Sequence, residues 1–98
     1  MPVAYVYNTG GSGEDYHRMT REGVGSATPA GLLLHAAGTA KDGSFYITEV
    51  WETREAHDRF GDEVIMPAFQ KYGIDPSQAT ITEIEVENLQ GAAVPNGV

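Results

Sequence analysis

The sequence predicts an α+β domain with a ferredoxin-like arrangement, in which helices cover one face of a four-stranded antiparallel sheet. The expected elements follow the order strand, helix, strand, strand, helix, strand (βαββαβ), which is the order of two split βαβ units. The two middle strands are neighbours in the chain, and the loop between them is short enough for a hairpin. At 98 residues, the chain can form one such domain with a modest core. We expect this domain at 1–89 and a flexible polar tail at 90–98.

The first strand is expected at Val3–Asn8, because this segment is β-branched and aromatic and lies between Pro2 and a glycine-rich turn. Asn8 has two interpretations, which the sequence leaves open. It is either a turn-forming residue at a strand end or an amide that faces a pocket and orients a ligand.

The first helix is expected at Ser12–Glu22. Ser12 and Asp15 are spaced as in a capping box, and Gly23 suits the position after the last turn. Tyr16 lies on the thin apolar edge of this helix.

The central hairpin carries the most informative residues of the chain. Its strands are expected at Leu32–Ala37 and Phe45–Trp51, which are aliphatic, β-branched and aromatic. The sequence Lys41-Asp42-Gly43 between them suits a three-residue loop with the glycine in the left-handed conformation.

This loop predicts a register. If Ala40 lies opposite Ser44, then His35 lies opposite Glu49; the other expected pairs are Leu33 with Trp51 and Ala37 with Ile47. Opposite residues share a face of the sheet, with Cβ atoms ~5 Å apart. The sequence therefore predicts an imidazole and a carboxylate side by side, next to Trp51. A change of one residue in the loop would send the partner to the other face.

The second helix is expected to begin after Thr53, a good N-cap, with Glu55 in the first turn, where the helix dipole favours it. Pro67 cannot lie deep inside a straight helix, so we expect a kink or a restart there, and an end at Gly73. The apolar face of this helix recurs at Ala56, Phe60 and Val64.

The last strand is expected at Thr80–Leu89, where alternation predicts a half-buried strand. A row of glutamates on one face could suggest a metal or acid/base site. We interpret it as a solvated face that discourages edge-to-edge aggregation. The row comprises Glu83, Glu85 and Glu87.

The charge balance disfavours several classes of partner. Six lysines and arginines stand against fourteen acidic residues, which gives a net charge of −8, so no basic patch is available to bind nucleic acid. The sequence contains no cysteine, and no apolar run approaches the ~20 residues of a membrane span. The first residues lack the pattern of a signal peptide, so a cytoplasmic location is expected.

The three histidines do not have the spacing of a metal site. His17, His35 and His57 fall on three different expected elements, and at least two would have to converge on one ion. We expect His17 to be solvated and His57 to be exposed or half-buried. The segment at 10–13 (GGSG) lacks the G-x-G-x-x-G pattern of a nucleotide-binding loop.

Several motifs together resemble the dimeric α/β-barrel superfamily, and within it small actinobacterial-type proteins related to the antibiotic-biosynthesis monooxygenases. The resemblance covers Val3 to Leu89, and its strongest part is the V-W-E-T-R-E-A tract that starts at Val50. It implies a homodimer in which two ferredoxin-like chains close a barrel, each with a pocket between its sheet and its helices. Members of the family include cofactor-independent quinone-forming monooxygenases, heme-degrading monooxygenases and polyketide cyclases.

The resemblance does not extend to the residues of the heme-degrading branch. Asn8 matches the asparagine of that pattern, but Phe60 stands where it has a tryptophan. Gln70 stands where it has the heme-ligating histidine. We therefore expect no heme, and no other bound cofactor or metal.

Two hypotheses follow for function. In the first, the protein is a cofactor-independent enzyme, of monooxygenase or cyclase type, that acts on an aromatic or polyketide-like molecule. His35 would be the general acid or base and Glu49 its orienting partner, while Asn8 would hold an oxygen of the substrate. Tyr16, Trp51 and Phe60 would line the pocket. In the second, the histidine and the glutamate are a structural pair in a ligand-binding or structural dimer.

Overall fold

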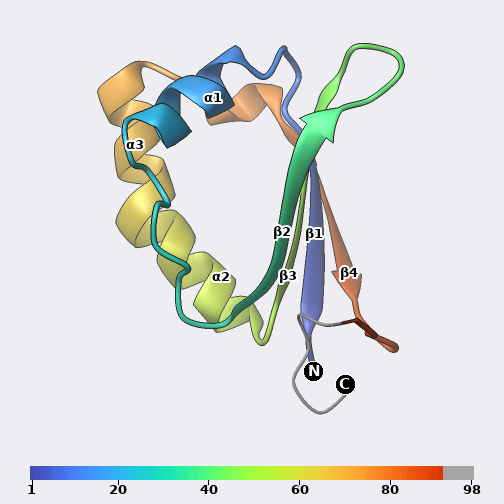
Figure 1. Ribbon diagram of the computed structural model, residues 1–98. Coiled ribbons are helices and arrows are strands. Elements are labelled where there is room, and N and C mark those ends of the chain that lie inside the picture. The colour runs from blue at the N-terminus through green and yellow to red at the C-terminus, as the bar shows by residue number, and fades with distance from the viewer. Residues whose placement is uncertain (92–98) are drawn as a thin grey trace.

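The computed structural model describes residues 1–91 and confirms the ferredoxin-like α+β fold (Figure 1). One antiparallel sheet of four strands has the order β2-β3-β1-β4, and the helices lie on one of its faces. The strands are β1 (Val3–Asn8), β2 (Leu32–Thr39), β3 (Phe45–Trp51) and β4 (Thr80–Glu85). The helices are α1 (Glu14–Arg21), α2 (Arg54–Phe60) and α3 (Met66–Tyr72), with the π-helical turn η1 (Gly61–Ile65) and the 3-10 turn η2 (Pro76–Gln78).

The hairpin loop forms as the sequence predicts. Ala40 and Ser44 are hydrogen-bonded at 2.8 Å, Gly43 is left-handed at φ +92°, and His35 pairs with Glu49. The prediction that Leu33 faces Trp51 is wrong. A bulge between Leu32 and Leu34 inserts an extra residue into β2, so that Leu32 is the partner of Trp51.

The capping box expected at the start of α1 is also wrong. The helix begins after Gly13, and no side chain caps it; the hydroxyl of Ser12 instead accepts a hydrogen bond from Glu14 N at 3.4 Å, within the preceding turn. Gly23 follows the helix at φ +92°, and Val24 N donates back to Met19 O at 3.0 Å. The end of the helix therefore matches the prediction, whereas its start does not.

The second helical segment begins at the predicted cap, since Thr53 Oγ1 accepts a hydrogen bond from Ala56 N at 3.1 Å. It widens into the π-helical turn η1 before it restarts at Pro67, in the first turn of α3. Proline has no N–H and its ring crowds the preceding turn, so a change of helix type at this point is expected. Gly73 ends the helix in the left-handed conformation.

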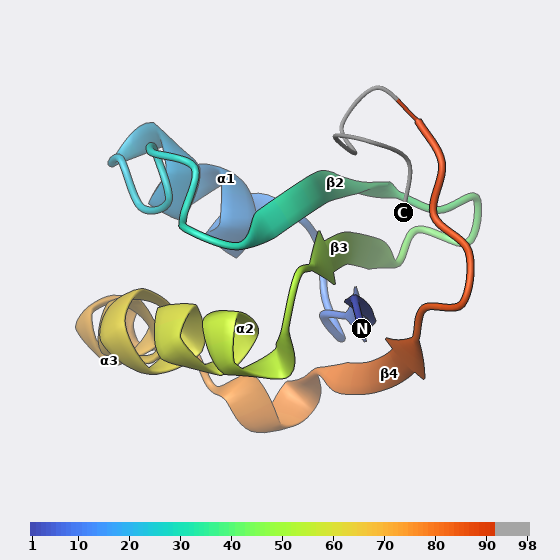
Figure 2. The same cartoon turned by 90° about the horizontal axis from the view of Figure 1, so that it is seen from below.

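The last strand is shorter and more exposed than predicted. β4 ends at Glu85 and all of its residues are exposed; one more hydrogen bond, from Val86 N to Pro2 O at 3.0 Å, follows it. The prediction of a half-buried strand that reaches Leu89 is therefore wrong, because β4 is an edge strand. The segment that follows, up to Gly91, runs on the side of the sheet away from the helices (Figure 2). Most of the tail predicted at 90–98 lies outside the described residues.

The core lies between the helices and the sheet. Its centre is Trp51, which is fully buried, and Val3 and Tyr5 are buried beside it. Ala56 and Phe60 of the second helical segment pack against this cluster. No helix in the described part of the chain has the length and apolar character that a membrane crossing requires.

Replacing Gly31 with alanine is expected to lower the free energy of unfolding by more than the ~1–3 kcal/mol of a strained backbone conformation alone. Urea denaturation measures this loss. Gly31 has φ +90°, and an added Cβ would lie 2.6 Å from the Cβ of Ala56. Gly43 is the matched control, because it has φ +92° but open space around it, so Gly43→Ala carries only the conformational cost. Equal losses in the two variants would contradict the close approach of Gly31 to α2.

Candidate functional site

Four polar side chains form a row across the helix-covered face of the sheet. The register places His35 of β2 opposite Glu49 of β3, Glu49 opposite Tyr5 of β1, and Tyr5 opposite Glu83 of β4. Opposite residues on neighbouring strands share a face, so this row runs from one edge of the sheet to the other. The row is the organising feature of the candidate site.

A chain of hydrogen bonds runs through the first half of this row. The Tyr16 hydroxyl lies 2.8 Å from His35 Nε2, and His35 Nδ1 lies 2.8 Å from Glu49 Oε2. Trp51 Nε1 donates to Glu49 Oε1 at 3.1 Å. The structure therefore brings together four of the six residues that the sequence proposes for the site.

The direction of each bond follows from the chemistry of the partners. The Trp51 indole can only donate, and an ionised Glu49 can only accept, so His35 Nδ1 must carry a proton toward Glu49. In a neutral imidazole the other nitrogen, Nε2, is then an acceptor. Tyr16 donates to it. This arrangement fixes the tautomer of His35 in which Nε2 is the acceptor, and the Tyr16 hydroxyl must turn away from Nε2 before a substrate proton can reach it.

The pair is buried at one end and open at the other. The side chain of Glu49 is 11% exposed, whereas that of His35 is 34% exposed because β2 is an edge strand. A carboxylate held in a buried position aligns the imidazole, and the exposed imidazole can reach a small molecule from solvent. This is the geometry that a general base needs.

A titration at alkaline pH should show that the Tyr16 phenol is partly buried. Burial, and then the negative charge of Glu49, raise the pKa of the Tyr16 phenol above its ordinary value. The unfolded chain ionises this group near pH 10, so its contribution to stability is complete below about pH 10 and is lost as pH rises above that value. The difference in phenolate absorbance between wild type and Tyr16→Phe should therefore titrate above pH 10. A difference that titrates at or below pH 10 would contradict the burial of this phenol.

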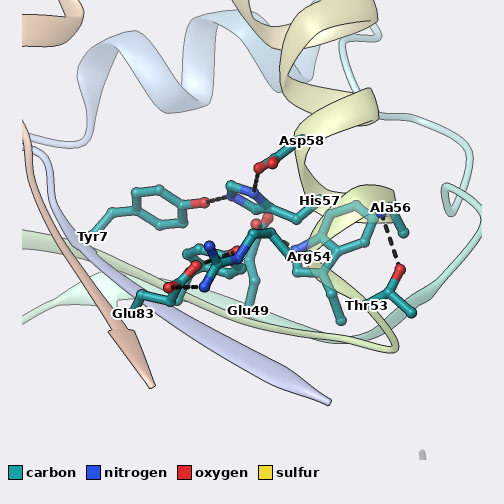
Figure 3. A network of polar contacts seen from close by, with 10 residues as sticks. Tyr7, Glu49, Thr53, Arg54, Ala56, His57, Asp58 and Glu83 are labelled. Carbon is teal, nitrogen blue, oxygen red and sulfur yellow. Dashed lines mark hydrogen bonds and ion pairs between the residues drawn. The ribbon is translucent and has the colours of Figure 1, made fainter. Parts of the chain in front are cut away.

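A second polar cluster, which the sequence did not predict, adjoins the first. His57 of α2 stacks on the Tyr5 ring, with centroids 3.6 Å apart, and meets Trp51 edge-on. Its Nδ1 lies 2.8 Å from Asp58 Oδ1, and its Nε2 contacts the Tyr7 hydroxyl (Figure 3). His57 is half-buried, as the sequence suggested, but the sequence offered no partner for it.

Glu83 is exposed, as the sequence suggested, but it also has partners that the sequence did not predict. It accepts a hydrogen bond from the Tyr5 hydroxyl at 2.8 Å and forms an ion pair with Arg54 (Figure 3). The Glu83 side chain thus closes the polar row at β4, next to α2.

The structure does not bring Asn8 to this site. Asn8 pairs with Tyr46 on β3, and its amide donates to the Tyr46 hydroxyl at 3.2 Å. Both side chains lie on the face of the sheet away from the helices, whereas Tyr7 lies on the helix-covered face. The Asn8 Oδ1 accepts from Gly10 N at 3.1 Å, which is the bond of a turn-forming asparagine. Side chains alternate along a strand, so Tyr7 and not Asn8 lies on the helix-covered face, and the turn-forming interpretation of Asn8 holds.

Phe60 lies behind the site and not in direct contact with its polar groups. Its ring centroid is 5.7 Å from that of Trp51. Phe60 also lines an apolar surface groove between α2 and the segment 23–30, together with Val64. A second, more polar groove runs along α1, where its lining includes Arg18 and Thr39.

The row of residues beside the polar row is only partly covered by the helices. Ala37, Ile47, Tyr7 and Ile81 form the next row on the helix-covered face. Ala37 is exposed, Ile47 is only partly buried, and Ile81 is 58% exposed. This row therefore offers partly exposed apolar surface next to the oriented polar groups, and it lies outside both of the grooves described above.

The site has no grouping suited to a metal ion. Within residues 1–91, no three histidine or carboxylate side chains converge as metal ligands would. Gln70, at the position of the heme ligand in the related pattern, lies exposed on α3.

Comparison with known proteins gives information on the fold. No protein-family model and no curated protein matches the sequence. Among solved structures, Rv0793 from Mycobacterium tuberculosis is 15% identical, with a TM-score of 0.65 over 94% of this chain and 99% of that one. A candidate antibiotic biosynthesis monooxygenase from Chloroflexus aurantiacus is also 15% identical, with a TM-score of 0.65 over 93% of this chain and 98% of that one.

A third similar structure carries a described activity. It is SnoaB from Streptomyces nogalater, a cofactor-independent oxygenase, which is 15% identical, with a TM-score of 0.59 over 90% of this chain and 95% of that one. The expected resemblance is thus confirmed for the fold: this chain folds like the antibiotic-biosynthesis monooxygenase-like proteins.

Proposed function

We propose that the protein is an enzyme that uses His35 as a general base on a small aromatic or polyketide-like molecule, without a metal or a bound cofactor. The observation that carries this proposal is the hydrogen-bonded chain from Tyr16 through His35 and Glu49 to Trp51. In this chain of hydrogen bonds, the buried carboxylate of Glu49 holds His35 so that its more exposed nitrogen, Nε2, is a hydrogen-bond acceptor. The fold shared with SnoaB is consistent with chemistry of this type.

The energetics favour a functional pair over a structural one. Burying a carboxylate costs free energy, and a buried ion pair is often less stabilising than apolar residues of the same size. A core built only for stability would have leucine or valine at the buried position of Glu49. The structure has a glutamate there, and hydrogen bonds with His35 and Trp51 satisfy and orient its two carboxylate oxygens.

The reaction would begin with transfer of a proton from a phenol or an activated carbon to His35 Nε2. In an oxygenation, the resulting anion would supply electrons to O₂, with one oxygen atom retained in a quinone and the other released as water. In a ring closure, the anion would attack a carbonyl carbon of the same molecule. Both reactions need the same base.

The test is turnover of polycyclic phenols and polyketones in air, with no metal, flavin or nicotinamide added. Oxygen uptake and product absorbance are followed for wild type and for His35→Gln. We expect turnover by wild type and a loss of about 10²–10⁴-fold in His35→Gln, with an unchanged circular dichroism spectrum. Equal turnover by the two proteins would contradict a catalytic role for His35.

We further propose that the protein is a homodimer that packs through the face of the sheet away from the helices. Leu34 and Ile84 belong to one apolar row on that face and are 42% and 46% exposed. Exposed apolar surface on a small domain often marks an interface. Sedimentation equilibrium should give twice the mass of the chain, and a lower mass for Leu34→Glu but not for Met66→Glu. Met66 is a matched control because it is 41% exposed but lies on α3.

A further inference from the structure

We infer that Tyr7, supported by His57 and Asp58, is the proton donor of the same site, and that the substrate carries a carbonyl oxygen which Tyr7 binds. This inference rests on the proposed function, since it pairs an acid with the base His35. It assigns a substrate class, namely ketones that form enols, such as 1,3-diketones and keto forms of phenols.

The first step of the argument is the arrangement around His57. The Tyr7 hydroxyl and the Asp58 carboxylate contact the two ring nitrogens, one on each side of the ring (Figure 3). An imidazole with a carboxylate on one nitrogen can hold a proton on that side in both of its charge states. In the imidazolium form, Nε2–H donates to Tyr7, which leaves the Tyr7 hydroxyl proton free to bind another oxygen.

The packing of His57 also suits a cationic ring. The ring lies parallel to Tyr5, with 9° between the planes, and a ring face attracts positive charge. The charged groups nearby come from three elements: Asp58 lies on α2 itself, Glu49 on β3 and Glu83 on β4. Glu83 is neutralised by Arg54 and hydrogen-bonded to Tyr5. An imidazolium at this position therefore faces a carboxylate and an aromatic face.

The second step is that Tyr7 and His35 face the same surface. Both lie on the helix-covered side of the sheet, with Glu49 of β3 on the strand between them. Burial first, and then the charge of Glu49, raise the pKa of the Tyr7 phenol above its ordinary value, so Tyr7 stays protonated. Ile47 of β3 lies between Tyr7 of β1 and Ala37 of β2, the edge strand that also carries His35. A flat substrate on Ile47 and Ala37 would have the base at one end and the Tyr7 hydroxyl at the other.

The protons balance without any redox change. His35 Nε2 takes the proton from the carbon next to the carbonyl, and the electron pair of that C–H bond forms the C=C bond of the enol. The carbonyl oxygen takes the Tyr7 proton, and Tyr7 takes the Nε2 proton of the His57 imidazolium. The product of this step is the enol tautomer of the substrate, with one proton gained by His35 and one lost by His57.

The test uses 4-nitrophenol as a probe, because its phenolate resembles an enolate oxygen and absorbs visible light. The dissociation constant and the ionised fraction of bound probe are measured for wild type, Tyr7→Phe and His57→Gln. We expect wild type to bind the phenolate, and Tyr7→Phe to bind it about 10-fold or more weakly, the effect of one hydrogen bond to a charged oxygen. His57→Gln should lower the ionised fraction of bound probe, which a purely structural role would not change.

Tyr46→Phe is the matched control, because Tyr46 lies on the opposite face and bonds only with Asn8 in the described hydrogen-bond network. Equal affinity of Tyr7→Phe and Tyr46→Phe would overturn the inference, and so would a wild-type protein that does not bind the phenolate. The proposed function is judged separately by turnover in His35→Gln. Normal turnover by His35 with no contribution from Tyr7 would therefore leave that proposal standing.

Discussion

Glu49→Gln is expected to lower turnover by about 10³–10⁴-fold, although the substitution changes neither size nor shape. The Trp51 indole can only donate, so the glutamine oxygen will face Trp51 and the glutamine NH₂ will face His35. An NH₂ donor turns His35 Nδ1 into an acceptor and moves the proton to Nε2. The imidazole is then in the wrong tautomer to act as a base, and an equivalent change in serine proteases costs about 10⁴-fold.

The same substitution at Glu83 is the control for this prediction. Glu83 lies in the same row of the sheet, but its partner Tyr5 donates through a hydroxyl, which a glutamine oxygen can also accept. Glu83→Gln should therefore keep most of the turnover. A loss in Glu83→Gln as large as that in Glu49→Gln would mean that the row is needed for packing rather than for proton transfer.

Trp51→Ala is expected to lower the free energy of unfolding by about 3–5 kcal/mol, which is a large part of the stability of a domain of this size. Trp51 is fully buried, and it packs against Phe60 and the edge of His57. Its loss leaves a cavity at the centre of the core and removes the donor that satisfies Glu49. Chemical denaturation followed by circular dichroism measures the effect, since Trp51 is the one tryptophan of the sequence.

Trp51→Phe separates packing from hydrogen bonding. Phenylalanine keeps an aromatic ring in the core but cannot donate to Glu49, so a smaller loss of about 1–3 kcal/mol is expected. If both variants are as stable as wild type, Trp51 is not the centre of the core. If Trp51→Phe alone loses turnover while remaining folded, the indole N–H is part of the positioning of Glu49.

The sequence was sufficient for the part of the site that a short loop controls. Three loop residues determine the register of the hairpin, and the register brings His35 and Glu49 together. The bulge between Leu32 and Leu34 changed one neighbouring pair. It was not predicted, because no local signal in the sequence marks the extra residue.

The rest of the site depends on contacts that are distant in the chain. β1 and β3 are joined by a helix and a hairpin, so no turn determines which of Tyr7 and Asn8 faces the helices. That choice depends on packing, and it places Tyr7 inward and Asn8 outward. His57 lies one position away from the apolar line of α2, and its partners on β1 become visible only when the helix is docked.

The most direct measurement of the central claim is the tautomer of His35, read from the ¹⁵N and ¹H shifts of its ring by NMR. The hydrogen bonds of Glu49 and Tyr16 predict that the neutral form of the ring carries its proton on Nδ1, with Nε2 as the acceptor of the Tyr16 hydroxyl. In Glu49→Gln the proton should move to Nε2. A wild-type ring protonated on Nε2 would contradict His35 as the base and leave the pair with a structural role alone.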